Sequence, residues 1–393
     1  MVMISESGLS PAMLAEPDRP AGHRRTRVGV VGAGYWGPKV IRNFAALPQA
    51  ELTMVCDLVA ARLDPVAAQY PGVRVTTSFA ELLASEVEAV AIATPLTTHY
   101  ALVKQALQAG KHVLVEKPLA ATTRQGAEIV ALAEESDRVL MVGHTFLFEP
   151  AVEALGALVR RGELGEIRHI TAQRLNLGPV RHDASALWDL APHDIAIRLD
   201  VLGCAPEAVR AQGAAYLQSG VHDVVQMELW FPGNRLAHVH LSWLDPVKVR
   251  RMTVVGSQKM AVYDDLAADK LVLYDRGVVL SATRDGHPEL LYRLGEPQPV
   301  ALPRADEPLR RQCAYFLDCV QRHIRPAPDG RLGLQVVRIL ERADHSLHKG
   351  GRYESLGWGT DTDPAVREVM ATTWWHWRSA ASAQLETVPE AAS

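Results

Sequence analysis

The chain has 393 residues, 48% of them hydrophobic, so it can bury a sizeable core and is long enough for about two domains. Its formal net charge of −4 argues against the basic field that nucleic-acid or anionic-membrane partners require. It has four cysteines, none in a CxxC pair, and no apolar run near the ~18 residues of a membrane span. These features predict a cytoplasmic protein without a metal cluster.

The two ends of the chain lack a clear hydrophobic period. Residues 1–26 mix Ser, Pro, Gly and charge, and they lack the apolar centre of a secretory signal. We expect residues 1–26 to be a disordered extension, and residues 357–393 to form a C-terminal helix followed by a frayed tail.

Residues 27–143 alternate short apolar strands with helices. The strands are RVGVVG, AELTMVCD, VEAVAIATP, KHVLVEKP and RVLMVGH, with helices such as 36–47 and 99–109 between them. Nearly continuous apolar strands separated by helices are typical of a parallel sheet that is covered on both faces. We therefore predict an α/β fold that begins with a doubly wound, dinucleotide-binding domain.

Residues 144–356 have a different pattern and predict a second domain for substrate binding and oligomerisation. A helix at 151–161 is followed by strands joined by turn signals and not by helices, and helices return at 307–322 and 332–348. Such a run predicts an open-faced, largely antiparallel sheet in a C-terminal α/β domain. The expected strands are 166–178, 224–231, 235–244, 249–257, 259–265 and 270–277.

The stretch GAGYWG places Gly32, Gly34 and Gly37 in the GxGxxG spacing, directly after a strand and at the start of a helix. The glycines allow a tight turn, close approach of a pyrophosphate to the backbone, and packing of the helix on the strand. Asp57 ends the next strand, where a carboxylate accepts hydrogen bonds from ribose hydroxyls and repels a 2′-phosphate. The pattern predicts NAD in preference to NADP; the alternative is a structural turn followed by a chance aspartate.

Lys117 follows the apolar run HVLVE at the carboxyl end of a predicted parallel strand, the edge where open α/β sheets bind ligands. Pro118 beyond it is a candidate for a cis peptide bond. Glu116 is either an ion-pair partner of the lysine or a cofactor contact. Taken alone, Lys117 could equally be a surface lysine.

Asp189 and His193 are four residues apart in WDLAPHDIAIRLDVLG, a spacing that puts both on one face of a helix. Because Pro192 disfavours a regular helix through Asp189, we expect the helix to begin near Pro192. Asp194 is then an acid at its N-terminus. A histidine beside a carboxylate suits proton transfer near neutral pH, although Asp189 could instead cap the helix over a core His193.

Together these motifs resemble the Gfo/Idh/MocA family of nicotinamide-dependent sugar and polyol oxidoreductases. The resemblance covers about Arg27 to Arg352 and rests on GAGYWG, TPLTTHYALVKQALQAGKHVLVEKPLA and WDLAPHDIAIRLDVLG, in this order. It implies that Lys117 holds the reacting oxygen, His193 is the acid/base, and Asp189 orients them. It also implies that the cofactor contacts, besides the glycines and Asp57, are Tyr35, Trp36, Thr94, Pro95, His99 and Glu116.

Candidate substrate contacts lie in two segments of the chain. In GHTFLFEP, Leu147 and Phe148 occupy positions where many family members have a basic residue, although His144 could contribute a contact. The segment RLNLGPVRHDASALWDLAPHD offers Arg174, Asn176, Arg181 and Trp188 as candidates for binding a sugar or a phosphate. Alternatively, these four residues make only loop hydrogen bonds and surface contacts.

The signatures NLGPVR…WDLAPHD and VVGSQKMAVYDD are similar to the family branch of bacterial polysaccharide and amino-sugar pathways. That branch implies NAD-dependent oxidation of a ring hydroxyl, often at C3, of a nucleotide-linked sugar. A PLP-dependent aminotransferase could then act on the ketone, in antibiotic amino-sugar synthesis among other routes. The family also implies a homodimer or homotetramer. The alternatives are a ketosugar reductase, an inositol or polyol dehydrogenase, and a dinucleotide sensor without turnover.

Overall fold

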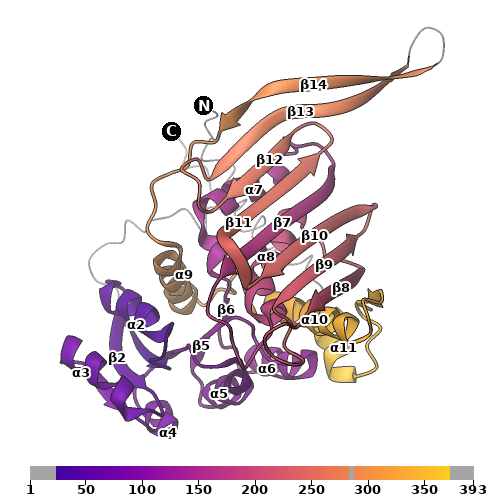
Figure 1. Ribbon diagram of the computed structural model, residues 1–393. Coiled ribbons are helices and arrows are strands. Elements are labelled where there is room, and N and C mark those ends of the chain that lie inside the picture. Colours follow the sequence, from indigo (N-terminus) through magenta and orange to yellow (C-terminus); the bar gives the residue numbers. More distant parts are fainter. Residues whose placement is uncertain (1–23, 283–286, 372–393) are drawn as a thin grey trace, which may run out of the picture.

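The computed structural model describes residues 24–282 and 287–371. Two sheets lie side by side, with the last helices of the chain beside both of them (Figure 1). Most of the predicted N-terminal extension, and the tail beyond residue 371, lie outside the described residues.

The first sheet has six parallel strands in the order β3-β2-β1-β4-β5-β6, which confirms the doubly wound domain. Its strands β1, β4 and β6 are almost wholly buried, which explains their continuous apolar sequences. Because the strand order reverses between β1 and β4, a crevice opens at their carboxyl ends, where ligands of such sheets bind. The strands are β1 (Thr26–Val31), β2 (Ala50–Cys56), β3 (Arg74–Thr76), β4 (Ala89–Ile92), β5 (His112–Glu116) and β6 (Leu140–Gly143).

Short helices connect these strands and cover the sheet. The helix that matters most for a ligand is α2, because it starts directly after the glycine loop. The helices are α2 (Gly37–Ala46), η2 (Ala60–Arg62), α3 (Asp64–Gln69), α4 (Phe79–Ala84), α5 (Leu96–Gln108) and α6 (Thr123–Glu135).

The second sheet has nine strands in the order β14-β13-β12-β11-β7-β10-β9-β8-β15. Only the β7–β10 pair is parallel among the described pairs, so the prediction of a largely antiparallel sheet is confirmed. The strands are β7 (Ile167–Leu177), β8 (Ala208–Ala214), β9 (Val224–Phe231), β10 (Arg235–Ser242), β11 (Leu244–Gly256), β12 (Met260–Asp264), β13 (Leu271–Ala282), β14 (Pro288–Pro299) and β15 (Glu354–Ser355).

One face of this sheet is covered by helices α7 (Pro150–Arg160) and α8 (Ala186–Leu202). On β9, buried side chains alternate with half-buried or exposed ones, as expected for a sheet with one open face. The short helix η3 (Thr145–Phe148) links the two domains directly after β6.

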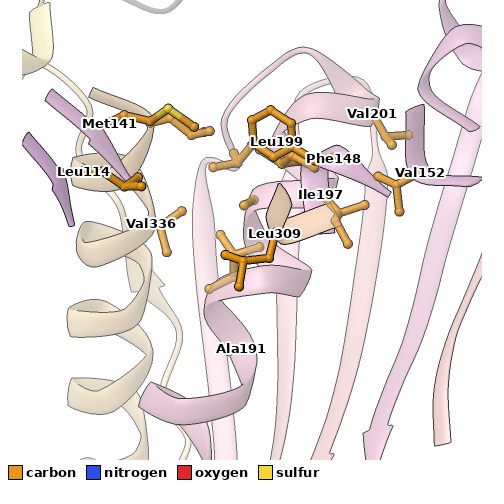
Figure 2. Packing of buried hydrophobic residues seen from close by; sticks show 14 of the residues in the cluster. Leu114, Met141, Phe148, Val152, Ala191, Ile197, Leu199, Val201, Leu309 and Val336 are labelled. Atoms are coloured by element: carbon orange, nitrogen blue, oxygen red, sulfur yellow. The ribbon is translucent and has the colours of Figure 1, made fainter. Parts of the chain in front are cut away.

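The helices after β14 return to the first domain. Phe316 of α9 (Pro308–Arg322) meets Phe44 of α2 edge to face, with ring centroids 6.5 Å apart. Helix α10 (Gly330–His348) packs against α6 and β6 of one domain and against α8 and β8 of the other, and α11 (Pro364–Ala371) packs on α6. Figure 2 shows the continuous core that results, in which Leu114 and Met141 of the first sheet lie near Val336 of α10.

Candidate active site

The glycine loop between β1 and α2 has the backbone geometry of an anion site. Gly32 has φ +96°, and a Cβ there would lie 2.5 Å from the Ala93 carbonyl oxygen. A Cβ at Gly37 would lie 2.0 Å from the Gly32 oxygen, whereas one at Gly34 would meet nothing within 4 Å. The loop is therefore tightly packed at Gly32 and Gly37 but open at Gly34, where the N-terminus of α2 can receive a pyrophosphate.

Asp57 lies directly after β2 and ties that strand end to the glycine loop. Its Oδ2 accepts a hydrogen bond from the Ala33 amide at 2.7 Å, and its Oδ1 accepts one from the Val59 amide at 2.8 Å. The side chain is largely buried, and Arg62 Nη1 lies 3.5 Å from Oδ1. Since a carboxylate has about four acceptor positions, Asp57 retains capacity for ribose hydroxyls, and these residues fit NAD.

Trp36 connects the glycine loop to the segment that carries the lysine. Its Nε1 donates to Glu116 Oε1 at 2.7 Å, and the Lys39 ammonium lies 4.4 Å from the centre of its ring. Burial raises the pKa of Glu116 to about 7, although the hydrogen bond from Trp36 and the charge of Lys117 oppose the shift. Tyr35 is fully on the surface of the loop.

The loop after β4 holds the other predicted cofactor contacts. Thr94 Oγ1 lies 2.7 Å from Thr98 Oγ1, and Pro95 occupies the N-cap position of α5. His99 differs from expectation: its side chain is buried, Nδ1 lies 2.8 Å from the Pro118 oxygen and Nε2 lies 2.9 Å from the Thr94 oxygen. Because backbone groups occupy both ring nitrogens, His99 supports the two loops and does not offer those nitrogens to a cofactor.

Lys117 directly follows β5 at the carboxyl edge of the first sheet, and its peptide bond to Pro118 is cis, as the sequence suggested. The ammonium donates to the backbone oxygen of Asp189 at 2.6 Å and lies 3.5 Å from Asp189 Oδ1. Burial lowers the pKa of Lys117, Asp189 opposes that shift, and Arg181 and Arg174 reinforce it. A lysine held in this way presents a desolvated positive charge.

The expectation that a helix begins near Pro192 is wrong, because α8 begins at Ala186 and contains Pro192. Asp189 is therefore in its first turn, and His193 follows one turn later on the same face. A proline inside a helix removes one backbone hydrogen bond and distorts the preceding turn. That turn contains the Asp189 carbonyl to which Lys117 donates.

Asp194 is also not the N-terminal acid that we expected. It lies in the interior of α8, buried, and its Oδ2 accepts a hydrogen bond from Arg174 Nε at 2.6 Å. Arg174 thereby lies in a buried ion pair, with its guanidinium 4.6 Å from the centre of the Phe146 ring.

His193 and His144 present buried ring nitrogens without a hydrogen-bond partner in the described part of the chain: Nδ1 of His193 and both nitrogens of His144. Burial, followed by the charges of Lys117, Arg174 and other neighbours, lowers the pKa of His193 well below its ordinary value. Burial and the charge of Lys117 lower the pKa of His144 to about 3. Both imidazoles are neutral at pH 7, and a bound molecule would satisfy nitrogens that are costly to leave unpaired.

The other predicted substrate residues lie around this group. Arg181 forms a two-point contact with Asp183, at 2.9 and 2.7 Å, and its Nη1 lies 3.5 Å from Asp189 Oδ1. Asn176, at the end of β7, is half-buried, and Trp188 is partly buried and packs against the hydrophobic core.

Three neighbours of the site were not predicted from the sequence. Trp243 Nε1 donates to Asp189 Oδ2 at 3.3 Å. Phe146 lies 4.8 Å from the His193 ring, and Arg250 lies 5.4 Å from Phe146. For Phe146, the departure from the usual basic pattern in GHTFLFEP was a usable signal; nothing local singled out the other two.

A glycine loop shaped for a dinucleotide, next to a buried lysine and a neutral histidine, defines a nicotinamide-dependent oxidoreductase with two domains. The chain belongs to the Gfo/Idh/MocA family. Residues 26–144 match the model described as oxidoreductase family, NAD-binding Rossmann fold, and residues 152–262 match the GFO/IDH/MocA C-terminal domain. The predicted family, oxidoreductase class and NAD cofactor are confirmed.

Among known proteins, the chain is similar to UDP-N-acetylglucosamine 3-dehydrogenase of Acidithiobacillus ferrooxidans, with 31% identity over 79% of this chain and 94% of that protein. The solved structure of that enzyme superposes with a TM-score of 0.70 at 29% identity, covering 83% of this chain and 99% of that one. Inositol 2-dehydrogenase of Rhizobium meliloti is 25% identical over 82% of this chain and 96% of that protein.

A second solved structure, GenD2 from gentamicin A biosynthesis in complex with NAD, shares the fold. Its TM-score is 0.71 at 24% identity, covering 86% of this chain and 98% of that one. Among residues 24–282 and 287–371, no helix combines the length and apolarity needed to cross a membrane.

Proposed function

We propose that the protein is an NAD-dependent sugar dehydrogenase that oxidises a ring hydroxyl, at C3, of a nucleotide-linked sugar or amino sugar. The observation that carries this proposal is the convergence of Lys117, Asp189 and His193 beside the glycine loop, with the Lys117 ammonium 2.6 Å from the Asp189 oxygen. The choice of substrate is supported by the similarity to UDP-N-acetylglucosamine 3-dehydrogenase over 94% of that enzyme.

In the oxidation, one residue stabilises the developing negative charge and another accepts the proton. When bound, NAD supplies the hydride acceptor at C4 of its nicotinamide. Lys117 donates a hydrogen bond to the reacting hydroxyl oxygen and stabilises the negative charge that develops there. His193, neutral because of its lowered pKa, accepts the hydroxyl proton as the C–H hydrogen leaves as hydride. Asp189 holds the ammonium in place and limits its loss of charge.

Two other functions are compatible with the same site residues. The similarity to inositol 2-dehydrogenase supports a free polyol as the second candidate substrate. The same residues would also serve a ketosugar reductase, with His193 returning the proton and Lys117 holding the carbonyl oxygen. A sensor without turnover would have no use for a neutral buried histidine beside a desolvated lysine.

The test is to incubate the purified protein with NAD or NADP and UDP-N-acetylglucosamine, other nucleotide sugars, free amino sugars and inositols. Absorbance of the reduced nicotinamide reports turnover. Turnover of a nucleotide sugar with NAD, lost in His193→Asn, supports the proposal, whereas turnover of inositol alone supports the second candidate. If NADH binds tightly but no substrate reacts in either direction, the result supports a dinucleotide sensor without turnover.

The wider setting follows from this chemistry. The ketone product is a substrate for a PLP-dependent aminotransferase acting next. We place the enzyme in the cytoplasm, as a homodimer or homotetramer, by analogy with the family; all four cysteines are buried and none forms a disulfide, which agrees with a reducing compartment.

A further inference from the structure

Arg181 lies in the segment between β7 and α8 and has two carboxylate partners. Its Nε and Nη2 donate to the two oxygens of Asp183 at 2.9 and 2.7 Å, and its Nη1 lies 3.5 Å from Asp189 Oδ1. The side chains of Arg181 and Asp183 are 39% and 40% exposed, so this pair contributes little to the stability of the fold. A ligand can therefore displace Asp183 from the guanidinium at small cost.

The same oxygen of Asp189 also serves the lysine of the site. Lys117 Nζ lies 3.5 Å from Asp189 Oδ1, so the ammonium and the Arg181 guanidinium share one carboxylate oxygen. Since both nitrogens lie at that distance from one atom, they are no more than twice that distance apart. A substrate whose reacting hydroxyl contacts Lys117 thus brings a group on the far side of its sugar ring within reach of Arg181.

The two cations also influence each other through space. Burial is the main cause that lowers the pKa of Lys117, and the charge of Arg181 adds to it. An anion bound to Arg181 would compensate that charge and draw Nη1 away from Asp189. The carboxylate would keep its orientation, because Trp243 Nε1 donates to its other oxygen at 3.3 Å.

The backbone of Arg181 is held in place, so its side chain can change partner while the loop stays where it is. The Arg181 carbonyl accepts a hydrogen bond from Gln218 Nε2 at 2.8 Å, and Gln218 Oε1 lies 2.6 Å from His182 Nδ1. Gln218 belongs to the turn between β8 and β9, where the buried Asp223 accepts hydrogen bonds from two backbone amides.

We propose that Arg181 recognises the diphosphate of a nucleotide-linked substrate and couples its binding to Lys117. The guanidinium exchanges Asp183 and Asp189 for phosphate oxygens, which its planar fork of donors fits, and this exchange leaves Asp189 Oδ1 to the ammonium. Binding energy from a remote part of the substrate is thereby used at the reacting hydroxyl. The inference rests on the proposed function, because a free polyol carries no such anion.

The first test measures the binding of UDP to the NADH-loaded protein by calorimetry and needs no turnover. Arg181→Gln should weaken binding about tenfold or more, because it removes charge-assisted hydrogen bonds. Asp183→Asn should strengthen binding, because it removes the competing carboxylate. The control Arg161→Gln breaks a pair of the same sequence spacing, with Glu163, and should leave the affinity unchanged. Equal affinity in wild type and Arg181→Gln, or weaker binding in Asp183→Asn, overturns the proposal.

The second test supplies the substrate in two pieces. The sugar is N-acetylglucosamine without its anomeric hydroxyl, which leaves room for the terminal oxygen of UDP. In the wild type, UDP should raise kcat/KM for oxidation of this sugar by NAD about tenfold, because the bound diphosphate releases Asp189 to Lys117. Arg181→Gln should show no increase. Absence of stimulation in the wild type overturns the coupling to Lys117.

The outcomes separate this inference from the proposed function. Turnover of UDP-N-acetylglucosamine with the same KM in wild type and Arg181→Gln overturns only the role of Arg181. Turnover of inositol alone, with no binding of UDP, overturns the proposed substrate and this inference together.

Discussion

Replacing Asp194 by Asn should destabilise the protein severely, because it leaves two buried guanidinium groups without their counter-charge. The Arg174–Asp194 pair is only 6% and 5% exposed, and Arg174 Nε lies 2.6 Å from Oδ2. Arg198 is fully buried; burial lowers its pKa to about 10, and Asp194 opposes that shift. Breaking a buried ion pair from one side typically costs about 3–5 kcal/mol, a large share of the ~5–15 kcal/mol that stabilises most folds.

The assay is urea unfolding of Asp194→Asn beside a matched control, Asp183→Asn. The control breaks the Arg181–Asp183 pair, which is 39% and 40% exposed, and should cost less than about 1 kcal/mol. Adding Arg174→Gln to Asp194→Asn removes one stranded charge and should recover part of the loss. The reasoning is refuted if Asp194→Asn unfolds at the same urea concentration as the control, or if the added substitution lowers stability further.

Three further predictions concern the site. Lys117→Met should lower kcat about 10²–10³-fold with NADH affinity intact, measured by nicotinamide fluorescence; a loss of affinity alone would contradict its role. Asp57→Ala should raise the NADP-to-NAD ratio of kcat/KM by about tenfold or more, because Arg62, now 3.5 Å from the carboxylate, becomes free to bind a 2′-phosphate; an unchanged ratio would contradict this. Because the pKa of His193 is lowered well below its ordinary value, kcat/KM for oxidation should persist below the pH at which an ordinary histidine becomes protonated, and should be lost only as pH falls further; a midpoint at the ordinary histidine pKa would contradict it.

The first domain could be predicted in detail because its signals are local. Buried strands produce apolar runs and a dinucleotide turn needs glycines, so the sequence around Gly32 and Gly37 specifies both. β14 was missed because Pro288, Pro297 and Pro299 argue against a strand, yet an edge strand tolerates proline on its free side. β8 was missed because its Ala- and Gly-rich sequence has weak strand propensity, and pairing with β9 holds it in place.

Within the site, only the relations that follow from spacing along the sequence could be predicted. The four-residue separation put Asp189 and His193 together correctly, although the proline between them suggested the wrong start for the helix. Contacts between segments distant in the sequence could not be predicted from local patterns. The contact of Trp243 with Asp189 is an example. Likewise, the burial of Arg174 beside Asp194 follows from how α8 packs on β7.

Helix α10 restricts movement of the two domains relative to each other. Because one helix packs on α6 and β6 of one domain and on α8 and β8 of the other, a rotation of the domains would have to shear its packed face. The phenylalanine contact between α9 and α2 restrains the same movement from the opposite end of the sheet. Substrate and cofactor should therefore enter by rearrangement of loops, such as the exposed turn at Tyr35, in a protein whose two halves move as one piece.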